Sequence, residues 1–253
     1  MWENDMKRHA LIIGSPGKVG TEDYLRGVLV DTENYKNYLM SPIGGAWYKD
    51  EVKTLIDPTS TQVSHAIQAA QQADYAFIVF SGHGAYSNSK GATILQINSN
   101  ETITSLELTR GFKKLSVVLD CCRKEVLMQV LEKRAFTVDA AAKQFNEADC
   151  RRYFDKNIND CAESFILINA CSINEYAYDD SNRGGYYSFS LLNQAQNWAN
   201  RLSIDTSKNY QIESIASMHE KAAEKVRILS SEKQNPTIQK PREGKYFPFC
   251  IVA

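Results

Sequence analysis

The chain has 253 residues, 43% hydrophobic and 23% charged, enough for one large or two small domains with a sizeable core. Lys and Arg total 29 and Asp and Glu total 30, so no basic excess points to nucleic acid or an anionic membrane as the main partner. No apolar segment is long enough to cross a bilayer and no signal peptide is recognisable, so we expect a cytoplasmic protein.

Six cysteines could form disulfides, bind metal, fill the core or act as nucleophiles; they are Cys121, Cys122, Cys150, Cys161, Cys171 and Cys250. A chain of this length does not need disulfides, and cytoplasmic thiols stay reduced. There is no C-x-x-C pair, and the four histidines lie far from any cysteine pair in sequence, so a metal site is not expected. Packing and catalysis remain open for the adjacent pair Cys121-Cys122.

Hydrophobic patterning predicts alternating strands and helices along the chain. In chain order we expect a strand at 9–14, a helix at 24–39, a strand at 52–56, and a helix at 63–70 behind a capping box at 59–62. A strand at 75–80, a helix at 104–112 and a strand at 115–119 follow. After a charged stretch at 123–163, partly helical around 135–145, come a strand at 165–170, helices at 188–202 and 212–229, and a strand at 246–252.

This alternation predicts an α/β fold with a mostly parallel sheet of about six strands and helices on both faces. Functional groups in such folds gather at the carboxyl ends of the strands. Three predicted strands end in turns that carry reactive or polar side chains: 81–84 (Ser-Gly-His-Gly), 120–123 (Asp-Cys-Cys-Arg) and 170–172 (Ala-Cys-Ser). We expect these turns to be neighbours in space. The last strand, 246–252, could pair with a second chain in a dimer or be capped within its own chain.

A cysteine and a histidine at adjacent strand ends could form a catalytic pair. A thiol attacks only as thiolate, and a histidine within hydrogen-bond reach can take its proton. Gly84 could direct its N–H to a developing oxyanion, with the N–H of the nucleophile as second donor. The residues alone leave open a structural histidine and a buried packing cysteine.

In order along the chain, these motifs resemble the caspase-like cysteine peptidase superfamily, which includes metacaspases and paracaspases. Residues 80–84 (FSGHG) resemble its histidine motif, and residues 119–124 (LDCCRK) its cysteine motif, closest to the paracaspase form. Residues 25–31 (LRGVLVD) resemble the start of its first helix, and 170–179 followed by 185–191 the opening of its small-subunit region. The resemblance implies one caspase-like domain over 1–253, of the bare kind found in many bacterial relatives.

The resemblance implies roles for individual residues. His83 would be the base and Cys122 the nucleophile, with the backbone N–H groups of Gly84 and Cys122 as oxyanion donors and Cys121 as a packing residue. A substrate pocket for Arg or Lys would be formed by acids, the matching positions being Asp31, Asp120 and Asp179, with Asp180 as an alternative to Asp179.

The chain also departs from family patterns. The acids that bind calcium in some metacaspases have no match after either motif, so no cofactor and no calcium dependence are expected. Residues 1–122 would be the large-subunit-like part, 123–163 a candidate processing loop and 164–253 the small-subunit-like part. Basic residues that self-cleavage could use are Arg134, Lys143, Arg151, Arg152 and Lys156.

The sequence therefore predicts a cysteine endopeptidase acting on proteins or peptides with Arg or Lys before the scissile bond. The resemblance suggests regulated cell death or antiviral defence as its setting, with an activator or a homodimer as partner. The alternative is a catalytically silent binding module of the same fold. A glutaminase is disfavoured, because the histidine precedes the cysteine and lies within Gly-His-Gly.

Overall fold

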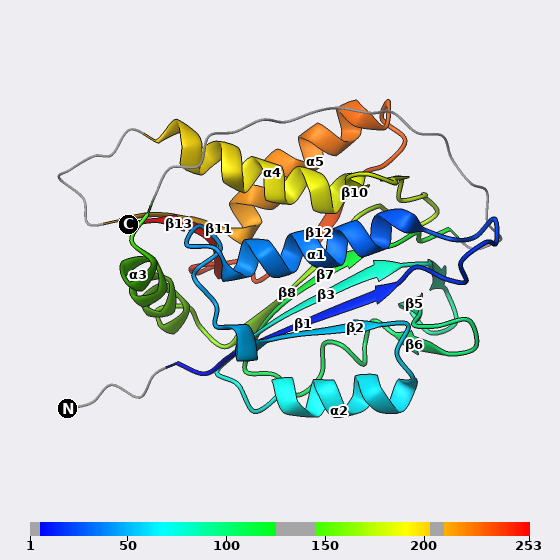
Figure 1. Cartoon of the computed structure of the whole chain (residues 1–253), viewed down its shortest axis with the longest axis horizontal. Coiled ribbons are helices and arrows are strands. Elements are labelled where there is room, and N and C mark those ends of the chain that lie inside the picture. Colours follow the sequence, from blue (N-terminus) through cyan, green and yellow to red (C-terminus); the bar gives the residue numbers. More distant parts are fainter. Residues whose placement is uncertain (1–5, 125–144, 203–209) are drawn as a thin grey trace.

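The computed structural model describes residues 6–124, 145–202 and 210–253 (Figure 1). The helices are α1 (Arg26–Met40), the 3-10 turn η1 (Lys49–Glu51), α2 (Ser60–Ala70), α3 (Glu147–Asn159), α4 (Tyr186–Arg201) and α5 (Ile215–Leu229). The strands from the first half are β1 (Arg8–Ser15), β2 (Val52–Ile56), β3 (Tyr75–Gly82), β4 (Gly84–Ser87), β5 (Ala92–Gln96), β6 (Thr102–Thr104) and β7 (Lys114–Asp120). Those from the second half are β8 (Ser164–Asn169), β9 (Asp179–Asp180), β10 (Gly184–Gly185), β11 (Gln211–Ser214), β12 (Thr237–Gln239) and β13 (Pro248–Val252).

A six-stranded sheet in the order β12-β8-β7-β3-β1-β2 forms the centre of the molecule. Five of its strands are parallel, and only β12, at one edge, is antiparallel to its neighbour β8. Strands from 1–122 and from 164–253 belong to this one sheet, so both parts share a core. The predicted α/β fold with a mostly parallel sheet is confirmed.

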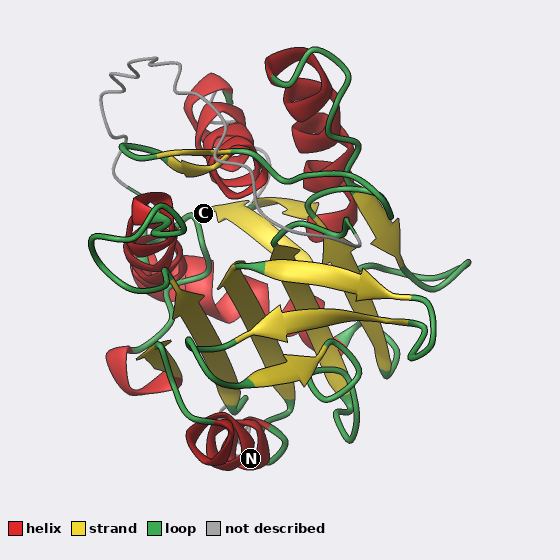
Figure 2. Cartoon of the chain, turned by 90° about the vertical axis from the view of Figure 1, so that its right-hand side faces the viewer, coloured by secondary structure: helices red, strands yellow, loops and turns green. Residues whose placement is uncertain are grey.

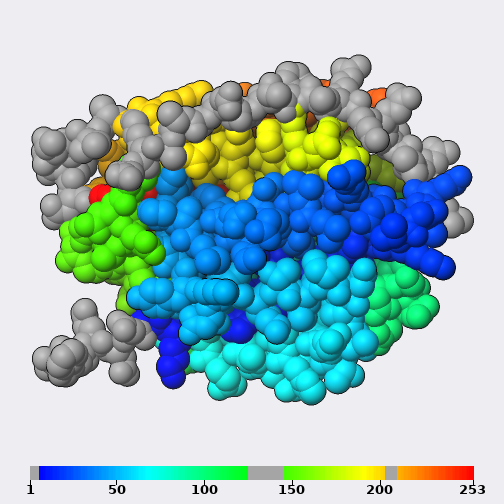
Figure 3. All heavy atoms as spheres, viewed as in Figure 1, coloured from blue at the N-terminus to red at the C-terminus, as the bar shows by residue number. Residues whose placement is uncertain are grey.

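Alternate residues of the central strands face two different cores, which is why these strands read as unbroken apolar runs. On β1, Ala10 and Ile12 face α1, α3, α4 and α5, whereas Leu11 and Ile13 face α2 and the small sheet β4-β5-β6. Figure 1 shows α1, α4 and α5 on one side of the sheet and α2 on the other. In the space-filling view α1 occupies the middle of its face, between the cyan segment that contains α2 and the yellow α4 (Figure 3).

Two local predictions are corrected by the structure, and an open alternative is settled. The segment expected as a helix at 104–112 forms successive turns at 105–111, with hydrogen bonds between residues three apart. Gly111, at φ +81°, ends this run of turns in a conformation that a helix cannot contain. The helix expected from 212 begins at Ile215, because Ser214 caps it and residues 211–214 pair with β13 as strand β11. The strand expected at 246–252 is confirmed as β13; of the two arrangements considered for it, the structure has pairing within its own chain, with β11.

Part of the predicted processing loop is helical. Of the five basic residues, Arg151, Arg152 and Lys156 lie in α3, where the backbone is not extended as a protease substrate must be. Arg151 is also held by a bidentate ion pair to Glu51, with N–O distances of 2.8 and 2.9 Å. Arg134 and Lys143 lie outside the described residues, as does the helical pattern at 135–145.

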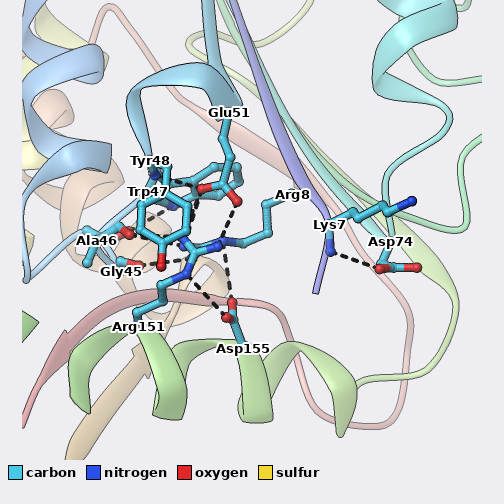
Figure 4. A network of polar contacts seen from close by, with 11 residues as sticks. Lys7, Arg8, Gly45, Ala46, Trp47, Tyr48, Glu51, Asp74, Arg151 and Asp155 are labelled. Carbon is cyan, nitrogen blue, oxygen red and sulfur yellow. Dashed lines mark hydrogen bonds and ion pairs between the residues drawn. The ribbon is translucent and has the colours of Figure 1, made fainter. Parts of the chain in front are cut away.

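A buried guanidinium secures the amino-terminal end of the sheet (Figure 4). Arg8, the first residue of β1, has a fully buried side chain that lies 3.4 Å from Asp155 on α3 and 3.6 Å from Glu51 on η1. Its guanidinium lies over the Trp47 ring at 4.5 Å. Burial lowers the pKa of Arg8 to about 10, while both carboxylates oppose that shift. Arg8 thus ties β1, η1 and α3 together.

We expect Arg8→Ala to lower the free energy of unfolding by about 3–5 kcal/mol, because it removes the fully buried cation of the cluster and leaves Glu51 and Asp155 with Arg151 alone. Arg151→Ala, at the edge of the same cluster, should cost about 1–3 kcal/mol, because water can replace its hydrogen bonds. Urea unfolding of both variants measures the difference. Equal losses would contradict the central role of Arg8.

Candidate active site

Three functional turns meet at the carboxyl end of the sheet. In the parallel pairing of β3 with β7, Ser81 lies opposite Asp120, so His83 and Cys122 each follow two residues after a paired position. Strand β8 flanks β7 on its other side, and the Ala170 N–H donates to the Leu119 carbonyl at 2.9 Å. Figure 2 views the molecule from the end at which these strands finish. The predicted convergence of the three turns is confirmed.

A cavity of about 620 Å³ opens at this end of the sheet. It lies among the strand ends, the loop before α1, the small sheet and the chain that leads to β9. Every residue that we expected in the site contributes to its lining: Asp31, His83, Gly84, Asp120, Cys122 and Asp179. One concave space therefore contains a thiol, an imidazole and the three expected carboxyl groups; Glu22, Asp23, Arg26 and Lys124 also contribute to its lining.

The imidazole of His83 is held by a backbone carbonyl. Its Nε2 lies 2.7 Å from the carbonyl oxygen of Asp23, in the loop before α1. A carbonyl oxygen can only accept, so Nε2 carries the hydrogen, and in the neutral ring Nδ1 is the nitrogen with a free lone pair. The carbonyl thus selects the tautomer in which Nδ1 can take a proton.

The thiol of Cys122 lies against the backbone of Ala177. The Ala177 N–H donates to Sγ at 3.4 Å, and Sγ lies 3.6 Å from the Ala177 carbonyl oxygen. Burial raises the pKa of the Cys122 thiol, and the nearby charges of Asp120 and Asp179 add to this effect, whereas the Ala177 hydrogen bond opposes it. The resting thiol is therefore predominantly protonated at neutral pH.

Close packing joins the histidine turn to the cysteine turn. A Cβ at Gly84 would lie 2.6 Å from the Cys121 sulfur and 2.9 Å from the Cys122 carbonyl oxygen, so no side chain fits there. Cys121 itself is buried in the core on the α2 side, as its interpretation as a packing residue predicts. All six cysteines are free.

Two carboxyl groups, those of Asp31 and Asp120, are buried in the pocket floor. Asp31 accepts from the Ser81 hydroxyl at 2.6 Å and from the Gly185 N–H at 3.0 Å. Asp120 accepts from the Ser188 N–H at 2.9 Å. Burial raises the pKa of Asp31 well above its usual range, with the charge of Asp120 as second cause, while its hydrogen bonds oppose the shift. Burial likewise raises the pKa of Asp120 to about 6, against its hydrogen bonds to Ser188.

The third acid of the cavity is Asp179 rather than Asp180. Asp179 lines the cavity, whereas the carboxylate of Asp180 accepts from the Asn182 N–H at 2.8 Å and is not among the lining residues. Burial raises the pKa of Asp179, the charge of Asp180 adds to the effect, and His83 opposes it.

Several contributors were not foreseen from the sequence. Ser81 belongs to the histidine motif, but its bond to Asp31 depends on α1 lying across the strand ends. Asp23 and Ala177 act through backbone atoms, which leave no signal in residue type. Tyr24, Tyr176 and Tyr178 also line the cavity and give it aromatic walls.

Within the described residues, no group of three or more His, Cys, Asp or Glu side chains is arranged to hold a metal ion. In the same part of the chain, no helix is both long and apolar enough to cross a membrane.

Comparisons with known proteins agree with this geometry. The family model for the caspase domain, Peptidase_C14, matches residues 7–247. Among solved structures, the chain is similar to caspase-1 from Spodoptera frugiperda, with a TM-score of 0.59 and 13% identity over 93% of this chain and 86% of that one. No curated protein matches the sequence significantly.

The fold, with a thiol and an imidazole lining one cavity, fits the cysteine peptidase class in general. With its family model matched over nearly the whole length, the chain belongs to the caspase domain family. The likeness to the insect enzyme, at 13% identity, is one of fold.

We expect Asp120→Asn to stabilise the protein at pH 8 by about 3 kcal/mol, because the raised pKa of Asp120 means that ionisation opposes folding. The wild type should lose stability as the pH rises from about 4 to about 6, since its native state retains a proton that the unfolded state releases. The Asn variant should lack this loss, so the wild type and the variant should be equally stable below about pH 4. Thermal unfolding of both proteins at pH 4 and pH 8 measures this difference in stability.

Asp50→Asn, which removes an exposed carboxylate, serves as control and should change the stability at neither pH. A destabilised Asp120→Asn protein at pH 8 would contradict the assignment of Asp120 as an uncompensated buried acid.

Proposed function

We propose that the protein is a cysteine endopeptidase that cleaves polypeptides after Arg or Lys, using Cys122 and His83. The observation that carries this proposal is that three carboxyl groups line the same cavity as the thiol and the imidazole. A cationic side chain in that cavity would offset negative charge that burial makes costly.

In the proposed first step, Cys122 Sγ attacks the scissile carbonyl carbon while its proton moves to His83 Nδ1. The carbonyl oxygen becomes an oxyanion that accepts from the N–H groups of Gly84 and Cys122. When the C–N bond breaks, the leaving amine takes the proton from His83 and a thioester remains. Water then gives a proton to His83 and attacks the thioester. As the C–S bond breaks, the thiolate recovers that proton and the carboxylic acid product leaves.

Arginine suits this pocket better than lysine. Its planar guanidinium has five donors and can bind two carboxylate oxygens at once, whereas an ammonium acts as a point charge. Asp31 and Asp120 are already oriented by backbone amides, so little side-chain freedom is lost on binding. We therefore infer a preference for Arg over Lys, in an enzyme nearer to metacaspases and paracaspases than to Asp-specific caspases. Regulated cell death or antiviral defence is the proposed setting.

We expect fluorogenic peptides ending in Arg to be cleaved faster than those ending in Lys, and peptides ending in Asp not at all. Cys122→Ala should lower Arg cleavage by at least about a thousandfold, because it removes the nucleophile. The assay is run with and without Ca²⁺, which should make no difference. Cleavage only after Asp would contradict the pocket.

Labelling by an arginyl chloromethyl ketone, followed by mass spectrometry, separates the two candidate functions. An adduct on Cys122 supports a protease even where turnover is slow. The absence of both turnover and an adduct would contradict the protease and favour a binding module.

We expect Asp179→Asn to have opposite effects on substrate and reagent. Cleavage after Arg should fall by about ten- to a hundredfold, because one charged partner of the guanidinium is lost. Alkylation of Cys122 by neutral iodoacetamide at pH 7 should become about two- to threefold faster, because a negative charge that raises the thiol pKa is removed. Parallel losses in both assays would indicate structural damage instead and would contradict the electrostatic role of Asp179.

A further inference from the structure

Each of the three pocket carboxyl groups lies directly against a glycine. A Cβ at Gly27, in the first turn of α1, would lie 2.7 Å from Asp179 Oδ2. A Cβ at Gly184 would overlap Asp31 Oδ1, and a Cβ at Gly185 would overlap Asp120 Oδ2. Two segments that are far apart in sequence, α1 and the β10 strand that leads directly into α4, thus bring their backbones into contact with the acids.

These approaches allow backbone amides to hold the acids. The Gly185 N–H lies 3.0 and 3.1 Å from the two oxygens of Asp31. The Ser188 N–H, in the first turn of α4, donates to Asp120. Amides at a helix start carry partial positive charge and orient a carboxylate without neutralising it as a cation would. The acids are therefore held in fixed orientations facing the cavity, where a bound cation would favour their ionised forms.

Gly27 is the most informative of the three glycines. It is a buried residue of α1, a place where alanine favours the helix and glycine does not. Its φ is not in the left-handed region, so backbone conformation does not require glycine. What a side chain would meet is Asp179 Oδ2 at 2.7 Å, the Asp180 carbonyl oxygen at 3.0 Å and the Gly184 Cα at 3.2 Å.

We propose that Gly27, Gly184 and Gly185 are specificity-determining positioning residues, whose missing side chains let Asp31, Asp120 and Asp179 converge on the cavity at a spacing that fits a guanidinium. This inference rests on the proposed function, in which the cavity binds a basic side chain. A methyl group at position 27 displaces the Asp179 carboxylate while the nucleophile and the imidazole stay in place.

The test is Gly27→Ala, measured on an Arg peptide and by calorimetric titration with agmatine, a small guanidinium compound. KM and the agmatine Kd should both rise about tenfold, as expected for the loss of one charge-assisted contact, with kcat within about threefold of wild type. The melting temperature should change by only a few degrees, because the helix preference of alanine offsets part of the crowding against the Asp180 carbonyl oxygen. Unchanged KM and Kd, or a fall in kcat alone, would overturn the proposal.

A double-mutant comparison shows whether the effect passes through Asp179. In an Asp179→Ala background there is no carboxylate for the new methyl group to displace, so adding Gly27→Ala should change KM by less than about twofold. A full further tenfold loss there would overturn the assignment. Gly244→Ala is the control for destabilisation alone: its Cβ would meet nothing within 4 Å, but alanine is strained at the φ of +105°, so the variant should melt at a lower temperature and leave KM and Kd unchanged.

The agmatine titration separates this inference from the proposed function. Wild type that binds agmatine but does not cleave Arg peptides would contradict the protease, and the Gly27→Ala effect on Kd would still test the glycines. Wild type that binds no agmatine would overturn the positioning role itself.

Discussion

The burial of two carboxyl groups, Asp31 and Asp120, beneath the strand ends is the constraint on which the site depends. Burying such groups next to one another is costly, and burial accordingly raises the pKa of both. The start of α4 offsets part of the cost, because the N–H groups of Gly185 and Ser188 point at these oxygens. A cation that enters the cavity would lower the remaining cost of burying these groups, and this gain would contribute to its binding. In the proposed function, the binding of a basic side chain and the energetic cost of the empty pocket then have one origin.

The same negative charge acts on the nucleophile. Cys122 lies two residues after Asp120, and Sγ touches Ala177, two residues before Asp179. Both acids raise the pKa of the thiol, so an empty pocket opposes thiolate formation. A guanidinium bound between the acids would cancel much of their field and lower the thiol pKa again. In the proposed enzyme, binding of a cation in the pocket and formation of the Cys122 thiolate are therefore electrostatically linked. A ligand without positive charge would neither bind to the acids favourably nor lower the thiol pKa.

Sequence alone predicted those elements in which the hydrophobic pattern and the flanking turn residues favour the same structure as the tertiary packing. Strands β1, β3, β7 and β8 are apolar runs that end in polar turns, and their order placed His83 and Cys122 side by side. The small sheet β4-β5-β6 and the short β9, β10 and β12 escaped prediction, because their residues are mixed and their pairing comes from tertiary contacts. Contributions of backbone atoms, such as the Asp23 carbonyl that orients His83, could not be predicted from residue type either.

The two ends of the central sheet handle buried charge in opposite ways. At the amino-terminal end, Arg8 and Arg151 both pair with Glu51 and Asp155, so two positive and two negative charges balance and the cluster holds β1, η1 and α3 together. At the carboxyl end the buried acids are neighbours of one another and are held by amides, which leaves a negative field over an open cavity. Balanced charge joins three elements of the scaffold, while the neighbouring acids at the other end would, in the proposed function, receive the cation of a substrate.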